Sequence, residues 1–422
     1  MDTVILKARR LIDGSGSPPI DDAAVVVEGN RIVGVYQGQV PDVVAPPHAE
    51  VVEFPDGTLL PGLIDCHVHL NLPGDGTPFV DTVRESDGVL IALSMRNARA
   101  ALRSGITTLR DCGGRGSTIF EVRRALDLGY GEGPRIVVCG QPITTTGGHT
   151  WYFGGEADGV DGVRQKAREM AKLGADFIKV MGSGGGTPGT KAWLPSFSKE
   201  EIAAVTDEAH RLGRKISVHC LCAEAMDYAV DAGVDQIEHA SFMVDAARTQ
   251  VFVPAVAHNI ARSGIFVTAT LAVTLHPILD LTAKEGQTPE ERAYVENSQA
   301  THEENLKLFA LLLDAGVRFV AGTDAGWLFT TFGSLVDEMD LMHEGGLSSL
   351  ETIASATSRA AEALGLKDKV GTIREGFEAD IIAVEGNPLT SLGALRNVRM
   401  VMQAGQLRFA EEQKPQYHRT DP

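Results

Sequence analysis

Histidines stand at the ends of several short apolar runs in this sequence, where they could hold metal ions. His67 and His69 lie two residues apart in LIDCHVHL, so on a strand both side chains point to one side and Val68 points to the other. Two neutral imidazoles placed in this way can chelate one borderline divalent cation such as zinc. His219 in KISVHC and His239 in DQIEHA each end a further apolar run.

A lysine and an aspartate occupy comparable positions. Lys179 lies in DFIKVM, and Asp324 ends VRFVAGTD, where its carboxylate would balance metal charge and accept a proton. A buried ammonium would repel metal ions, but burial disfavours the charged form of a lysine. The neutral amine can add carbon dioxide to give a carbamate, whose two oxygens could bridge two metals. Each residue alone has an ordinary interpretation, as a packing histidine, a salt-bridge lysine or a Schiff-base lysine, and only their joint occurrence at five strand ends favours a metal site.

The elements around these residues alternate regularly. Eight short apolar runs, read as strands, are separated by helical patterns that often stop at a glycine. This order predicts an α/β fold, a (β/α)8 TIM barrel in which catalytic side chains sit at the carboxyl ends of the strands, so the six residues would share one mouth. An open doubly wound sheet is the alternative. The predicted helices span residues 86–104, 118–128, 162–173, 198–212, 222–232, most of 245–263, and about 287–315.

Strand-like sequence flanks the predicted barrel on both sides. Residues 1–60 contain short β segments with a hairpin turn at Gly29–Asn30, and β texture returns after residue 364. The simplest interpretation is a small split β-sandwich domain made of residues 1–60 and 365–422, with the barrel of residues 61–364 inserted between them. The last ten residues are polar, and we expect a loosely held C-terminal tail.

Composition limits the possible partners. The chain has 422 residues, with 38 lysines and arginines against 56 aspartates and glutamates, which gives a net charge of −18. Such a surface repels nucleic-acid phosphates and anionic membranes, and no apolar run approaches the ~20 residues of a membrane span. Five cysteines, an odd number, argue against a disulfide framework. We therefore expect a cytoplasmic protein that binds neither nucleic acid nor membranes.

Together these motifs resemble the amidohydrolase superfamily. The resemblance rests on HVH, the lysine of FIKVM, the histidines of ISVHC and IEHA and the aspartate of AGTDAG, with the leader PGLIDCHVHL and the tail VGTIREGFEADIIAV. Within it, GVDQIEHA, FVAGTDAG and TTLRDCGG resemble the imidazolonepropionase-related branch, which includes Xaa-Pro and Xaa-Arg dipeptidases and some carbamate or phenylurea hydrolases. Imidazolonepropionases proper lack the bridging lysine, so the dipeptidase-like members are the closer match.

The resemblance implies two divalent metal ions, with zinc as the expected metal. Carboxylated Lys179 and a hydroxide would bridge the two ions, and Asp324 would take the proton of the hydroxide and pass it to the leaving nitrogen. The remaining ligands would divide between a more buried ion, held by His67, His69 and Asp324, and a more exposed ion, held by His219 and His239.

Candidates for substrate binding are fewer. His149 in TTTGGHTWYFGG could reach a substrate carbonyl or carboxylate, or could only stabilise its loop. Tyr228 resembles a carboxylate-binding position of dipeptidase members, although core packing is the slightly favoured interpretation. Arg110 and Asp111 look like a structural strand-end pair, so the cation that would anchor a substrate carboxylate is not identified. An aromatic substrate would suit the rings of Trp151, Tyr152, Phe153, Trp193, Trp327 and Phe329.

The favoured function is hydrolysis of the C–N amide bond of a dipeptide or N-acyl amino acid. Hydrolysis of a carbamate, phenylurea or related aromatic xenobiotic is the alternative, because it would use the same metal site with different loops. A non-catalytic amidohydrolase-like binding protein is a remote third possibility, since every ligand position is filled. We expect a small-molecule substrate and a homo-oligomer.

Overall fold

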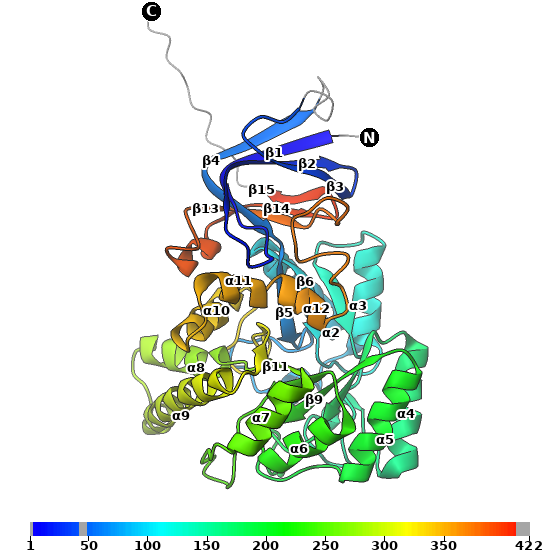
Figure 1. Cartoon of the computed structure of the whole chain (residues 1–422). Coiled ribbons are helices and arrows are strands. Elements are labelled where there is room, and N and C mark those ends of the chain that lie inside the picture. The colour runs from blue at the N-terminus through cyan, green and yellow to red at the C-terminus, as the bar shows by residue number, and fades with distance from the viewer. Residues whose placement is uncertain (1–2, 42–48, 411–422) are drawn as a thin grey trace, which may run out of the picture.

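The computed structural model describes residues 3–41 and 49–410, so the predicted C-terminal tail lies outside the described residues. Figure 1 shows a β-rich end that contains both the first and the last strands, and a larger end built of alternating strands and helices. The two ends meet where β4 runs on towards β5. The fold is α/β, as predicted.

The β-rich end is one seven-stranded sheet that mixes the two ends of the chain (Figure 1). The C-terminal strand β13 pairs antiparallel with β4, with Ile381 opposite Pro61. The β2–β3 hairpin turns at Gly29–Asn30, as predicted. The sandwich packing and the domain boundaries stay predictions. In sheet order the strands are β15 (Gln406–Ala410), β14 (Val398–Gln403), β13 (Ile381–Glu385), β4 (Glu50–Pro61), β1 (Thr3–Leu11), β2 (Ile20–Glu28) and β3 (Arg31–Gln37).

The larger end contains two parallel sheets, ordered β5-β6-β7 and β12-β11-β10-β9-β8. Backbone contacts join these sheets at both edges: Ile143, after β7, bridges Val180 in β8, and Ala325, after β12, bridges Val68 in β5. The strands are β5 (Leu63–Val68), β6 (Ile106–Asp111), β7 (Arg135–Val138), β8 (Phe177–Met181), β9 (Lys215–Cys220), β10 (Gln236–His239), β11 (Phe266–Thr268) and β12 (Arg318–Phe319).

Helices follow most of these strands. Gly174 and Gly233 end their helices in the left-handed conformation, with φ of 96° and 73°, as expected for glycines at helix ends. The helices are α1 (Phe79–Thr82), α2 (Asp87–Arg103), α3 (Thr118–Asp127), α4 (Gly159–Leu173), α5 (Lys199–Arg211), α6 (Ala223–Ala232), α7 (Pro254–Ser263), α8 (Ala272–Ala283), α9 (Pro289–Asp314), α10 (Leu335–Glu344), α11 (Ser349–Ser355) and α12 (Ser358–Ala363), with 3-10 turns η1 (Trp151–Phe153) and η2 (Leu392–Arg396).

The prediction of a mostly helical segment over residues 245–263 was wrong for its first half. Helix α7 begins only at Pro254, because proline lacks an N–H and fits the first turn of a helix, while Val253 before it is extended. Residues 243–250 instead form a tight turn, closed by an antiparallel bridge between Met243 and Gln250. This turn follows β10 and therefore lies beyond one of the strand ends that carry the predicted ligands.

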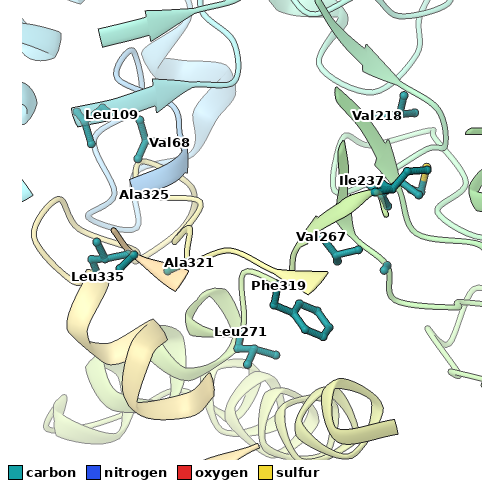
Figure 2. Close-up of a cluster of buried hydrophobic side chains, with 14 of the residues drawn as sticks. Val68, Leu109, Val218, Ile237, Val267, Leu271, Phe319, Ala321, Ala325 and Leu335 are labelled. Carbon is teal, nitrogen blue, oxygen red and sulfur yellow. The ribbon is translucent and has the colours of Figure 1, made fainter. Parts of the chain in front are cut away.

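Apolar side chains from the parallel strands form the main core. Figure 2 shows Val68, Val218, Ile237, Val267 and Phe319, from five different strands, all of them buried. Val68 and Val218 are direct chain neighbours of predicted ligands. Their burial in this core agrees with the alternation that turns the ligand side chains the other way.

Two further observations bear on the environment of the chain. No described helix is both long and apolar enough to cross a membrane. The five cysteines are all free and buried.

One buried ion-pair group joins the two ends of the molecule. Arg135, at the start of β7, binds the carboxylates of Asp380 and Glu378 beside the seven-stranded sheet, each at 2.7 Å. The Asp380 side chain is only 1% exposed. Removing the guanidinium would leave the Asp380 carboxylate without a cation in a poorly hydrated place, whereas Glu378 would keep its ion pair with Lys369.

We predict that Arg135→Met lowers the free energy of unfolding by roughly 3 kcal/mol, because the buried Asp380 carboxylate loses its cation and Glu378 loses one of its two. Urea unfolding followed by circular dichroism measures the change. Lys199→Met is the matched control, since the Lys199–Asp231 pair is about half exposed on both sides and its loss should not measurably shift the midpoint. Equal midpoints for the two variants would contradict a stabilising role for Arg135.

Candidate metal centre

The strand ends deliver the predicted ligands to one place. Asp324 and His239 have left-handed backbones, with φ of 60° and 72°, which side-chain-bearing residues rarely adopt and which is often found at functional sites. The predicted ligands come from five strands or the residues just after them: His67 and His69 from β5, Lys179 from β8, His219 from β9, His239 from β10 and Asp324 after β12.

The imidazole rings form a continuous series. From His69 to His67 the ring centroids are 5.4 Å apart, and from His67 to His239 the distance is 5.1 Å. His239 lies 4.6 Å from His219, which in turn lies 4.7 Å from His149. The structure thus brings the four predicted histidine ligands together and adds His149 at one end of the series.

One half of the cluster has the form of a three-ligand site. Oδ1 of Asp324 lies 3.5 Å from Nε2 of His67 and 3.3 Å from Nε2 of His69, and one ligand atom from each residue falls within 4.8 Å of the other two. Nδ1 of His69 is 3.0 Å from the carbonyl of Gly113 and must donate to it. Nδ1 of His67 faces the carboxylate of Glu238 at 2.7 Å. Both Nε2 atoms therefore keep a lone pair for a metal.

The other half is arranged in the same way. Nε2 of His219 is 3.2 Å from the carbonyl of Gly184 and donates to it, which leaves Nδ1 with a lone pair. Nδ1 of His239 is hydrogen-bonded to the Thr270 hydroxyl at 2.7 Å, which leaves its Nε2. Each histidine of the pair thus keeps one nitrogen able to bind a metal.

Lys179 supports the fit of metal ions to this site. Its side chain is 1% exposed, and its Nζ has no hydrogen-bond partner, a costly arrangement for a buried amine. Oδ1 of Asp324 is likewise buried without a hydrogen-bond partner. A carbamate on Lys179, with cations among these groups, would satisfy both, so the donor set fits two divalent cations.

The charge state of the cluster also suits metal binding. Burial lowers the pKa of His239 to about 3, and the positive charge of His67 acts in the same direction. Burial opposes ionisation of Asp324, but His67 and His69 outweigh it and hold the pKa of that carboxyl below its usual range. His69 differs, because the neighbouring Asp324 carboxylate outweighs burial and raises its pKa. Burial also lowers the pKa of His67 and His219, so three of the four histidines favour the neutral form and Asp324 favours the carboxylate, the protonation states that metals require.

Glu238 is a functional residue that sequence reasoning missed. It is fully buried, and its carboxylate binds Nδ1 of His67, the hydroxyl of Ser217 and, at 2.6 Å, the guanidinium of Arg110. Strand alternation places Glu238 opposite its neighbour His239, but the left-handed backbone of His239 breaks that alternation. The only signal was the acidic residue in the apolar run DQIEHA.

Arg110 and Asp111, which the sequence suggested as structural residues at a strand end, each have their own internal partners. Arg110 binds Glu238, and Asp111 accepts hydrogen bonds from the backbone N–H groups of Leu70 and Gly113. Arg110 is thereby committed inside the protein and cannot anchor a substrate.

A second group of possible ligands is less suitable. Single atoms of His67, Cys112 and Glu238 also lie within 4.8 Å of one another. Burial raises the pKa of the Cys112 thiol to about 12, so the thiolate is disfavoured, and Glu238 already has three partners. The group with Asp324 is the better candidate.

The two predicted substrate-binding residues have different surroundings. His149 is buried beside His219, and its Nδ1 is hydrogen-bonded to the Thr187 hydroxyl at 2.8 Å. Burial is the main reason that its pKa falls to about 3. Tyr228, on α6, is half-buried against the core and donates its hydroxyl hydrogen to Glu224. The structure thus places His149 next to the ligands, and it gives Tyr228 a partner on its own helix.

Aromatic rings border the His69 side of the cluster. Phe79 stacks between Tyr152 and Trp327, with centroid distances of 4.8 and 5.1 Å. Phe153 stacks on His69 at 6.0 Å. These rings come from the segments after β5, β7 and β12, so they tie three of the loops beyond the strand ends together.

A cavity of about 220 Å³ lies elsewhere, around the amino ends of β8, β9 and β10. Arg110, Ser217 and Gln236 are among its lining residues, but none of the predicted metal ligands is. It is therefore distinct from the cluster.

Two solved enzyme structures are similar to this chain over nearly its whole length. A Xaa-Pro dipeptidase crystallised with methionine in its active site is 29% identical, covers 96% of this chain and 99% of its own, and has a TM-score of 0.83. A prolidase in complex with N-methylphosphonate-L-proline is 28% identical. The match covers 97% of this chain and 100% of the prolidase chain, with a TM-score of 0.83.

Sequence comparisons agree. Ochratoxinase of Aspergillus niger is 30% identical over 430 residues, which cover 94% of this chain and 84% of that protein. The family model described as "Amidohydrolase family" matches residues 58–408, and it confirms the resemblance inferred from the motifs. The chain belongs to the amidohydrolase family.

Proposed function

We propose that this member of the amidohydrolase family, a hydrolase of C–N bonds, cleaves the amide bond of a dipeptide or N-acyl amino acid with two bound divalent metal ions. The observation that carries the proposal is the buried amine of Lys179, unpartnered in the structure, in a cluster with four histidines and Asp324. Such a position suits a bridging carbamate better than an ammonium.

The eight parallel strands are best interpreted as a closed (β/α)8 barrel. The contacts at both edges of the two sheets, Ile143 with Val180 and Val68 with Ala325, support closure. We further propose that the barrel is inserted in the split β domain.

We divide the ligands between the two ions as the family resemblance implies. We assign His67, His69 and Asp324 to one ion, His219 and His239 to the other, and the Lys179 carbamate to both. The carbamate forms when the neutral amine adds carbon dioxide, which creates an N–C bond and releases one proton. When bound, the ions would activate water and polarise the scissile carbonyl.

Protein groups would carry the protons. Asp324 is ionised, buried and without a hydrogen-bond partner on Oδ1, so this oxygen can accept a proton from the attacking water. The same carboxyl can return the proton to the leaving nitrogen. His149, neutral and beside His219, is placed to donate a hydrogen bond to the substrate from its Nε2.

The position of His67 depends on Glu238. This carboxylate receives the Nδ1 proton of His67 and is itself fixed by Arg110 and Ser217, so the ring is held with Nε2 towards Asp324. We assign Glu238 as a positioning residue for metal binding.

The similar proteins guide the choice of substrate. A similar Xaa-Pro dipeptidase holds methionine in its active site, and a similar prolidase is complexed with N-methylphosphonate-L-proline, so they support a dipeptide or N-acyl amino acid as the substrate of this chain. The rings of Phe79, Tyr152 and Trp327 favour an aromatic substrate as the second candidate. A cytoplasmic location, zinc as the metal, and a homo-oligomer stay predictions.

Lys179→Ala tests the bridging carbamate. We expect the variant to lose more than about 100-fold in kcat, because a ligand shared by both metals is removed. Added acetate or propionate should restore part of the activity by supplying a carboxylate in the same space. Metal content, measured by mass spectrometry, should fall from two ions towards one or none. Full activity of the variant without added acid would rule the carbamate out.

Glu238→Gln tests the positioning of His67. The amide keeps the shape but loses the charge, and we expect metal affinity, measured by competition with a chelator, to fall about 10- to 100-fold. Asp207→Asn is the matched control, because this carboxylate lies half exposed on α5 and pairs with Arg164. Equal chelator resistance of the Glu238→Gln variant and the wild type would contradict the assignment.

A substrate panel tests the reaction itself. The enzyme loaded with zinc and bicarbonate is assayed with Met-Pro, N-acetyl-L-methionine, a phenyl carbamate and a phenylurea, with release of amine as the readout. We expect the dipeptide or the N-acyl amino acid to be cleaved fastest. Faster cleavage of the carbamate or urea would favour the aromatic alternative. Absence of bound metal and of any hydrolysis after metal addition would contradict an enzymatic role.

A further inference from the structure

A tight turn beyond β10 carries an arginine with no partner. Arg248 is exposed, and its guanidinium makes no hydrogen bond or ion pair with any described residue. The arginines in and just after β6 are engaged: Arg110 binds Glu238, and Arg115 binds Asp87. The chain therefore holds an uncommitted guanidinium on the loop that follows the strand of His239.

The turn holds Arg248 in a fixed and unfavourable backbone conformation. Its φ is 63°, a value that glycine adopts easily but arginine rarely does. One carboxylate oxygen of Asp245 accepts hydrogen bonds from the N–H groups of Ala247 and Thr249, and the N–H of Arg248 bonds to the Asp245 carbonyl. Strain at a residue held in place by its surroundings is a recurrent feature of ligand-binding sites.

Packing ties the base of this turn to segments that border the metal cluster. The N–H of Met243 bonds to the carbonyl of Leu221, two residues after His219, at 2.6 Å. Met243 also packs with Ala192, in the same loop as the Thr187 that binds His149. On its other side the turn is tied to α9, where Gln250 donates to Asn305.

We propose that Arg248 binds the free α-carboxylate of the substrate at the edge of the metal site, an inference that rests on the proposed function. A guanidinium presents two parallel N–H donors that match the two oxygens of a carboxylate. His149, on the cluster side, would then face the substrate nearer the scissile bond. Arg248 is thus a specificity-determining residue that selects substrates ending in a free acid.

The test compares matched acid and alcohol ligands. The metal-loaded enzyme is assayed with N-acetyl-L-methionine and with N-acetyl-L-methioninol, which lacks only the carboxylate, and binding of L-methionine and L-methioninol is measured by calorimetry. Arg248→Met should reduce the acid-to-alcohol ratio of kcat/KM, and the corresponding ratio of affinities, by about tenfold or more, as expected for a hydrogen-bonded charge pair. Arg248→Lys should fall between the variant and the wild type.

Two further variants separate this effect from others. Arg248→Gly removes the side chain and also relieves the backbone strain, so it should fold at least as well and show the same loss of selectivity. Lys191→Met removes another exposed cation without a described partner, on the loop between β8 and α5, and should keep the wild-type ratio.

The outcomes are distinguishable from failure of the proposed function. Hydrolysis that persists with an unchanged acid-to-alcohol ratio in Arg248→Met and Arg248→Gly overturns the anchor alone. An equal loss in Lys191→Met also overturns it, because a general positive field would then explain the preference. Failure of the wild type to hydrolyse any amide overturns both proposals.

Discussion

The metal cluster is the central constraint on this structure, because it buries polar groups that have no hydrogen-bond partner within the protein. A protein interior normally rejects an amine such as that of Lys179 or a carboxylate oxygen such as Oδ1 of Asp324 when each lacks a partner. Here they share one buried cluster with four imidazoles that each keep a nitrogen uncommitted. Cations placed among these groups would remove the penalty, so metal binding and the stability of this region are coupled.

The surrounding fold holds the ligand side chains in fixed positions. The apolar residues beside the ligands, such as Val68 and Val218, anchor the strands in the core, so the imidazoles can turn the other way (Figure 2). Behind His67, Glu238 and Arg110 compensate each other's charge away from water. A single buried carboxylate would be costly there, but with Arg110 it stays ionised and can orient a ligand without adding net charge.

The sequence was sufficient wherever a local pattern determines the outcome. The eight parallel strands, the helix ends at Gly174 and Gly233 and the convergence of His67, His69, His219 and His239 follow from periodicity and strand ends. The sequence was insufficient where an unusual backbone conformation interrupts the periodic pattern of a strand or helix. The left-handed His239 turns Glu238 inward, and Pro254 with Asp245 replaces half a predicted helix by a turn. Arg110 was placed at a strand end, but its partner comes from another strand 128 residues away, which no local pattern reveals.

Net charge and local charge act at different distances in this molecule. The total of −18 would repel an anionic substrate, yet at physiological ionic strength that field decays over about 8 Å. Near the cluster we expect the local charge to be positive, because bound divalent cations would add positive charge and the guanidinium of Arg248 pairs with no described carboxylate. An acidic protein can therefore accept a carboxylate-bearing substrate, provided that a cation lies within a few ångströms of its binding place. The acidic surface then concerns solubility, and the few residues beyond the strand ends determine which substrates enter.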